Sequence, residues 1–182
     1  MDPRVGRRVA RRPAPGGGGD GQREPRLWPP PPRPGYPRPI PACWLIKSEP
    51  FKYPWSKLVA NGRAVWDGVC NFEARNNLRA MAEGYLVLFY HSNEGKEIVG
   101  VSPVIKTAFQ DPTTPEDWSV VEVAPVAPLA RPLSLAAIKA DPALATMALL
   151  RRSRLSVTPV TAPELAHILA TTGTVLPKRR AG

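Results

Sequence analysis

The sequence has few of the residues that build covalent cross-links or metal sites. Only two cysteines, Cys43 and Cys70, and two histidines occur among its 182 residues. Two cysteines cannot form a disulfide framework, and these two lack the spacing of zinc ligands, so neither a metal nor another cofactor is expected. No apolar run approaches the roughly 20 residues of a membrane-spanning helix. The N-terminus also lacks the apolar segment of a secretory signal, and we expect a cytoplasmic protein without membrane association.

Residues 1–41 contain almost no aliphatic side chains. They hold 12 of the 24 prolines and 7 of the 14 glycines. Such a stretch cannot bury enough apolar surface to offset its ordering entropy, which predicts a disordered Pro/Gly/Arg-rich extension. A nonspecific nucleic-acid arm or an SH3-type ligand are two possible uses. The absence of regular spacing favours a third interpretation, an unselected extension from a start codon assigned too far upstream.

The net charge of +10 is concentrated at the two ends of the chain. Nine arginines against three acidic residues give residues 1–41 a net charge of +6. Lys178, Arg179 and Arg180 add +3 in a basic tail over 177–182. Only +1 is left for residues 42–176, so this part has no overall field that would steer a polyanion. Binding of nucleic acid must therefore depend on a local site.

Residues 42–176 are rich in Val, Leu and Ala and can build one folded domain. Short apolar runs at 43–47 and 85–90 predict buried strands, and 97–109 and 118–126 predict two more. Three of these strands follow one another in hairpin order. The pattern therefore predicts an α+β domain around a curled, mainly antiparallel, barrel-like sheet.

Helix signals lie between and after these strands. Pro54 in a first turn favours a helix over 54–59, and Asn71 can cap a helix over 72–82 that ends at Gly84. A capping box, Thr161-x-x-Glu164, opens a last helix that ends near Gly173. Further helices are predicted at 135–140, capped by Ser134, and at 144–151, with a short β-like stretch at 154–157.

Four segments place polar side chains directly after, or within, an apolar stretch. Such groups cost free energy unless they are hydrogen-bonded, so they either satisfy one another or face a ligand. The segments are Lys47-Ser48-Glu49-Pro50, Trp66-Asp67-Gly68-Val69-Cys70-Asn71, Phe89-Tyr90-His91-Ser92 and Arg151-Arg152-Ser153-Arg154-Leu155-Ser156.

The turn Trp66-Asp67-Gly68 carries groups that can hold a nucleotide base. A tryptophan face stacks on a base with about 1–3 kcal/mol, and a carboxylate accepts a hydrogen bond from an exocyclic amine. Gly68 lets the backbone approach closely. The same residue types also suit a core tryptophan beside an aspartate that caps a turn, so both interpretations stay open here.

The arginines near these segments have two interpretations each. Arg75 lies under the predicted cap at Asn71, where it could hold a phosphate at the helix N-terminus or brace the loop by pairing with Asp67 or Glu49. The brace is slightly favoured. The dense cluster of Arg151, Arg152 and Arg154 could contact phosphates or form the solvated C-terminus of a helix.

A catalytic role finds little support in the sequence. Adjacent strand residues point to opposite faces, so His91 and Ser92 do not form a base–nucleophile pair. Glu49 with His91 is the one acid/base pair that can be nominated, and His167 lies in an apolar helix where a structural role is simplest. We therefore expect a binding protein and not an enzyme.

Taken in their order along the chain, the motifs resemble the EVE domain family. They are Trp44-Leu45-Ile46-Lys47-Ser48-Glu49-Pro50, Trp66-Asp67-Gly68-Val69 with Asn71, Ala74-Arg75-Asn76, Phe89-Tyr90-His91-Ser92, and Arg154-Leu155-Ser156-Val157 with Pro159-Val160. The resemblance covers about residues 42–172. It implies a PUA-like fold, related to the YTH readers of methylated adenine in RNA, and binding of a modified base in nucleic acid, with modified cytosine in DNA as the leading ligand.

The resemblance also implies a site, which would receive the base after it flips out of the helix. By position, the ligand-binding residues would be Lys47, Ser48, Glu49, Trp66, Asp67, Gly68, Val69, Asn71, Tyr90, His91 and Ser92, with support from Arg75, Arg152 and Arg154. The chain departs from the family pattern at Cys70, where a basic or polar residue is more usual, and at Phe72, where Tyr is common. The alternatives are an RNA-binding PUA-like module for tRNA or another structured RNA, and an enzyme acting on nucleotides.

Overall fold

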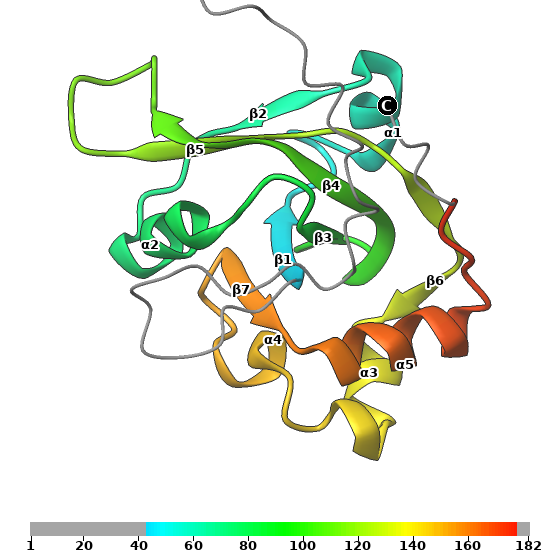
Figure 1. Ribbon diagram of the computed structural model, residues 1–182. Helices are drawn as coiled ribbons and strands as arrows, with labels where there is room; N and C mark the ends of the chain where they lie inside the picture. The colour runs from blue at the N-terminus through cyan, green and yellow to red at the C-terminus, as the bar shows by residue number, and fades with distance from the viewer. Residues whose placement is uncertain (1–42, 178–182) are drawn as a thin grey trace, which may run out of the picture.

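A seven-stranded sheet runs through the computed structural model, which describes residues 43–177 (Figure 1). The extension predicted for 1–41 and the charged residues of the predicted basic tail lie outside the described residues. The strand order is β2-β5-β4-β3-β1-β7, and β6 also pairs with β4. The strands are β1 (Cys43–Ser48), β2 (Ala64–Trp66), β3 (Leu86–His91), β4 (Glu97–Gln110), β5 (Ser119–Val123), β6 (Ala127–Ser134) and β7 (Val157–Val160).

The pairing confirms a mainly antiparallel, curled sheet. The 14-residue strand β4 pairs with β3 and β6 along its first half and with β5 along its second half. Register shifts after Val104 and after Lys106 let β4 bend between these partners. The strand order leaves β2 and β7 at its two ends, so within the described residues the sheet does not close. One pair, β1 with β3, is parallel, which the hairpin pattern did not predict.

Helices connect and cover the strands. The predictions for α1 (Trp55–Asn61), α3 (Leu135–Ala140) and the capping box of α5 (Ala162–Thr172) are confirmed. Helix α2 (Phe72–Ala80) ends two residues earlier than predicted, because Met81 has extended backbone. The longest of these helices, α5, has 11 residues, and no described helix is long and apolar enough to span a bilayer.

Three further elements differ from the predictions. The helix expected at 144–151 is split into a 3₁₀ turn (Pro142–Leu144) and α4 (Ala148–Arg151), because the buried Met147 between them is extended. The β-like stretch at 154–157 lies three residues further on, as β7. Strand β6 was missed because it contains Pro128 and Pro132, which a strand tolerates at positions that donate no ladder hydrogen bond.

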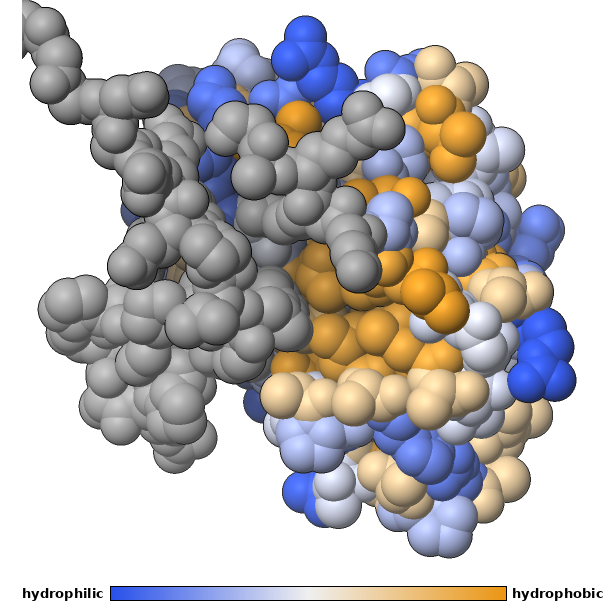
Figure 2. All heavy atoms as spheres, turned by 45° about the vertical axis from the view of Figure 1, so that its right-hand side comes forward, coloured by the Kyte–Doolittle hydropathy of each residue, from blue (hydrophilic) through white to orange (hydrophobic). Residues whose placement is uncertain are grey.

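Apolar side chains pack on both faces of the sheet and form two clusters. In β1, Trp44 and Ile46 enter one cluster while Cys43 and Leu45 enter the other. A strand buried on both faces carries a continuous apolar run, as 43–46 does. Figure 2 shows further apolar residues gathered on the side of the molecule that carries β6 and the C-terminal segment, with polar residues around them.

Glycine at position 100 lets α1 lie against β4. A Cβ atom there would come within 2.5 Å of the Trp55 indole, far closer than any real contact. The Trp55 ring packs edge-on against Phe89 at 5.4 Å, and its backbone N–H donates to His91 Nε2 at 3.1 Å. These contacts fix α1, and the turn before it, beside the ends of β1 and β3.

Candidate functional site

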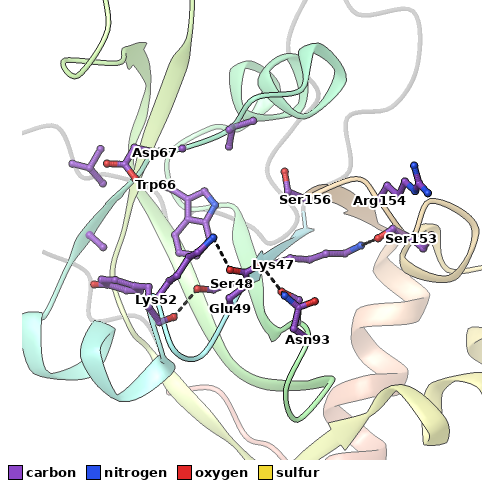
Figure 3. Close-up of a pocket in the computed structure, with 16 residues that line it drawn as sticks. Lys47, Ser48, Glu49, Lys52, Trp66, Asp67, Asn93, Ser153, Arg154 and Ser156 are labelled. Atoms are coloured by element: carbon purple, nitrogen blue, oxygen red, sulfur yellow. Dashed lines mark hydrogen bonds and ion pairs between the residues drawn. The ribbon is translucent and has the colours of Figure 1, made fainter.

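A pocket of about 530 Å³ opens beyond the C-terminal ends of β1 and β3 (Figure 3). Because these two strands are parallel, the residues that follow them meet at one edge of the sheet. The segment from β2 and the loop before β7 complete the wall. The predicted residues that line the pocket are Lys47, Ser48, Glu49, Trp66, Asp67, Gly68, Val69, Ser92 and Arg154.

Lys47 is the half-buried cation of the pocket. Its Nζ donates to the carbonyl oxygen of Ser153 at 2.7 Å, and its backbone N–H donates to the carbonyl of Ser156 at 3.0 Å. Burial lowers the pKa of this ammonium below its ordinary value. An ammonium has three N–H donors, and the Ser153 carbonyl is its one hydrogen-bond partner among residues 43–177. Two donors are therefore available to a ligand.

The Glu49 carboxylate is held from two sides by residues that the sequence did not indicate. Asn93 Nδ2 donates to one carboxylate oxygen at 2.7 Å, and Lys52 Nζ lies 2.6 Å from the other. Figure 3 shows both side chains directed at Glu49. Asn93 has a φ of 65°, which asparagine adopts more readily than most residues. This arrangement fixes an acceptor at the pocket.

Trp66 forms a fixed aromatic wall. Only 8% of the residue is exposed, and its ring packs edge-on against Phe89 at 5.5 Å and Tyr53 at 6.3 Å. Tyr53 also lines the pocket, although the sequence did not mark it. Ser48 holds the segment between β1 and α1 that carries Tyr53, because its Oγ donates to the Tyr53 carbonyl at 2.6 Å. Trp66 is thus both a core residue and a pocket residue, so the two interpretations of this tryptophan combine.

The backbone conformation gives Gly68 a role in addition to the predicted close approach to a ligand, which stays a prediction. Gly68 has a φ of 70°, a left-handed conformation that favours glycine, and an added Cβ would meet nothing within 4 Å. The turn conformation therefore favours glycine here, and packing within the domain does not require it. The neighbouring Cys70 is exposed, and its thiol donates to the Gly68 carbonyl with a 3.7 Å separation.

Three predicted site residues lie outside the pocket wall and support neighbouring elements. Tyr90 is 4% exposed and packs in the second apolar cluster, on the other face of β3. His91 accepts the hydrogen bond from Trp55. Asn71 caps α2, where its Oδ1 accepts from the N–H of Ala74 at 3.0 Å.

The arginines are divided among different tasks. Arg75 is a brace, but its partner is Asp117, with N–O distances of 2.8 and 3.1 Å, and not Asp67 or Glu49. Arg152 pairs with Glu73. Arg154 lines the pocket and also a neighbouring cavity of about 280 Å³, which it shares with Asn71, Glu73, Arg151, Arg152, Ser153 and Leu155. Basic groups therefore border the pocket on the side of α4.

Comparison with known proteins decides the family. A model of the family described as EVE domain matches residues 42–171. The chain belongs to the EVE domain family. Thymocyte nuclear protein 1 of Homo sapiens is 34% identical, with 70% of this chain and 72% of that protein covered.

Solved structures agree with this EVE fold. A protein from Rhodopseudomonas palustris is 42% identical with a TM-score of 0.71, covering 77% of this chain and 99% of that one. Human thymocyte nuclear protein 1, solved in complex with DNA that contains 5-methylcytosine, is 33% identical with a TM-score of 0.66, covering 71% and 96%. Within residues 43–177 of this EVE domain, no three His, Cys, Asp or Glu side chains are grouped to hold a metal ion.

We expect the stability of this EVE domain to depend on pH through His91. Burial lowers the pKa of His91 from its ordinary 6.5, and the charge of Glu97 opposes this shift only in part. A histidine with a lowered folded-state pKa contributes stability above pH 6.5 that is lost as the pH falls through the folded-state value. The free energy of unfolding, measured by urea denaturation, should therefore decrease as the pH is lowered from 7.5 to 5.

The matched variant for this prediction is His91→Gln, whose side-chain oxygen can still accept from Trp55 but does not titrate. Its unfolding free energy should fall less steeply over the same pH range. The two proteins differ only at this position, so groups common to both contribute equally to the comparison. Equal slopes in the two proteins would assign the pH dependence to groups other than His91.

Proposed function

We propose that this EVE domain binds a modified cytosine in DNA, which enters the pocket after flipping out of the duplex. The observation that carries the proposal is a preformed pocket with a fixed aromatic wall, a cation and a fixed carboxylate, in a chain 33% identical to a protein solved with 5-methylcytosine DNA. Its volume of about 530 Å³ lies within the range of roughly 300–1,000 Å³ typical of small-ligand sites.

The pocket chemistry suits the edges of cytosine. The ring can contact Trp66 and Tyr53, since base–aromatic contacts tolerate any base with a π face. The two remaining N–H groups of Lys47 match the acceptors on a pyrimidine edge, and an acidic group, Glu49 or Asp67, accepts from the exocyclic amine. The donors of Lys47 and the carboxylate acceptor are thus complementary to the acceptors and the amine of cytosine. Without a ligand, these groups would be hydrogen-bonded to water.

Arginines in the cavity next to the pocket would contact the DNA backbone. Arg151 and Arg154 are exposed in the cavity next to the pocket, and no ion pair involves either of them within residues 43–177. The folded part has almost no net charge, so such local cations carry the electrostatic share of binding. Phosphate contacts of this kind position the strand without reading its sequence.

The proposal is binding without catalysis. The acid/base pair suggested by the sequence, Glu49 with His91, is separated by the contacts of both residues: Glu49 is held by Lys52 and Asn93, while His91 accepts from Trp55. Within residues 43–177, no hydrogen bond joins the two side chains.

The test is a titration of the full chain with DNA duplexes that differ in a single cytosine, either unmodified or carrying a 5-methyl or 5-hydroxymethyl group. Burying one methyl group is worth about 0.8 kcal/mol, so the methylated duplex should bind about fourfold more tightly than the unmodified one. An RNA duplex of the same sequence serves as the second arm. Equal affinities for all DNA duplexes would contradict the proposal, and tighter RNA binding would favour the RNA-binding alternative.

A further inference from the structure

An aromatic pair lies at the start of α2, outside the pocket, with Phe72 exposed and Trp118 half-buried. Phe72 is the first residue of this helix and is 65% exposed. Its ring is stacked on that of Trp118, with a centroid distance of 5.3 Å and an angle of 13° between the planes. The guanidinium carbon of Arg75 lies 5.0 Å from the Phe72 ring centre and 5.7 Å from that of Trp118. These three residues are called the Phe72 platform below.

Polar contacts hold the platform in place from the inside. Arg75, whose side chain is only 15% exposed, donates to the Asp117 backbone and side chain. Arg79 pairs with the same carboxylate and donates to Ser119 Oγ at 2.8 Å. The Trp118 Nε1–H donates to Glu116 at 2.8 Å. Arg75 and Trp118 are therefore held by polar contacts, and Phe72 packs against both of them, which reduces the entropy cost of binding to this surface.

The platform lies close to the pocket along the chain, and the sequence neighbours of Phe72 line a cavity next to the pocket. Val69 lines the pocket and Phe72 is three residues further on, a span of at most about 11 Å in an extended chain. This corresponds to roughly three base-pair steps of B-DNA at 3.4 Å each. Asn71 and Glu73, on either side of Phe72, line the arginine cavity that shares Ser153 and Arg154 with the pocket.

We infer that the Phe72 platform is a second nucleobase site, which stacks on an unpaired base close to the one in the pocket. This inference rests on the proposed function. When one base flips out, the adjacent bases lose a stacking contact and the opposite base loses its pairing partner, at a cost of a few kcal/mol. A preformed aromatic surface offsets part of that cost, because stacking on a protein ring contributes about 1–3 kcal/mol per base.

The chemistry around the platform favours a nucleobase over a protein partner. Among the described residues, Phe72 is the one large hydrophobic side chain on α2 or the β4–β5 loop that is strongly exposed, so the apolar area is small. Protein-binding surfaces need a larger contiguous apolar patch. The exposed Arg151 and Arg154 line the cavity that the sequence neighbours of Phe72 also line, and Arg154 lines the pocket as well, so cations are available for the phosphate that links two bound nucleotides.

The experiment places 2-aminopurine, a fluorescent base whose emission is quenched by stacking, beside a single 5-methylcytosine. Three duplexes carry it on the 5′ side, on the 3′ side or opposite the modified base, which distinguishes the possible sources of the stacked base. With the wild-type full chain, emission from one of the three positions should be quenched on binding. In Phe72→Leu this quenching should be lost and the affinity should fall about five- to tenfold, while Phe72→Tyr should retain both.

A matched control is Phe51→Leu, because Phe51 is 66% exposed, as Phe72 is, but lines neither the pocket nor the neighbouring cavity and, within residues 43–177, makes no aromatic contact with the Phe72 platform. This variant should leave quenching and affinity unchanged. Equal quenching in wild type and Phe72→Leu, or equal effects of both leucine variants, would overturn the inference. Binding of 5-methylcytidine monophosphate tests the pocket alone, so a failure of the platform is distinguished from a failure of the proposed function; if neither duplex nor nucleotide binds, both fail.

Discussion

Replacing Lys47 with methionine should weaken binding of a duplex with one 5-methylcytosine by roughly tenfold to a hundredfold. The ammonium has two N–H donors available to the base, and a hydrogen bond to a charged group contributes about 1.5–3 kcal/mol. Each 1.4 kcal/mol corresponds to a factor of ten in affinity. Isothermal titration or fluorescence anisotropy at fixed salt measures the difference directly.

Stability should change little in this variant, because burial already disfavours the charged form of Lys47 and methionine fills a similar volume. The unfolding free energy should stay within about 1 kcal/mol of wild type, the net worth of the lost hydrogen bond to Ser153. Lys139→Met is the control, since it removes the same charge from an exposed position on α3. An affinity within twofold of wild type would show that Lys47 does not contact the ligand.

The pH dependence of binding gives a second readout for Lys47. Burial lowers the pKa of its ammonium, so the charge is lost at a lower pH than for an exposed lysine. The affinity advantage of wild type over Lys47→Met should therefore shrink as the pH is raised. A structural role alone would leave the ratio of the two affinities constant.

The pocket residues that were predictable share one physical signature. Lys47, Ser48 and Glu49 are polar groups that end a buried strand, and polar groups there need partners or a ligand. The turn at 66–69 carries an aromatic ring beside a carboxylate, two groups that can stack on a base and accept from its exocyclic amine. What could not be predicted is the parallel pairing of β1 with β3, which brings Ser48 and Ser92 to one edge.

The residues misplaced by sequence reasoning depend on which face of a strand borders the pocket or on distant partners. Tyr90 follows the simple alternation of β3, with Val87 and Phe89 in one apolar cluster and Leu88 and Tyr90 in the other. The sequence does not show which of these two faces borders the pocket. The brace of Arg75 is completed by Asp117, 42 residues away, in a loop whose position depends on the β4–β5 hairpin. Local spacing contains no information about such a pair, whereas caps such as Asn71 and Thr161 are local and were predictable.

Replacing Trp66 with alanine should destabilise the domain by about 3–5 kcal/mol, the usual cost of deleting a large buried aromatic side chain. Trp66 is 8% exposed and contacts Phe89 and Tyr53, so its removal leaves a cavity between β2 and the core. For a folded part of this size, 1 kcal/mol shifts the melting temperature by roughly 3–5 °C. Thermal unfolding should therefore show a decrease of roughly 10–20 °C.

Binding by Trp66→Ala must be separated from this loss of stability, and Phe89→Leu is the matched control. Phe89 contacts Trp66 within the same cluster but does not line the pocket. At a temperature where both variants are folded, Phe89→Leu should bind nearly as wild type, whereas Trp66→Ala should lose about 1–3 kcal/mol of base stacking. If folded Trp66→Ala binds with wild-type affinity, Trp66 has a role in the core and none in binding. The opposite result would mean that one ring stabilises the fold and forms the binding surface, so that the pocket is rigid because it is part of the core.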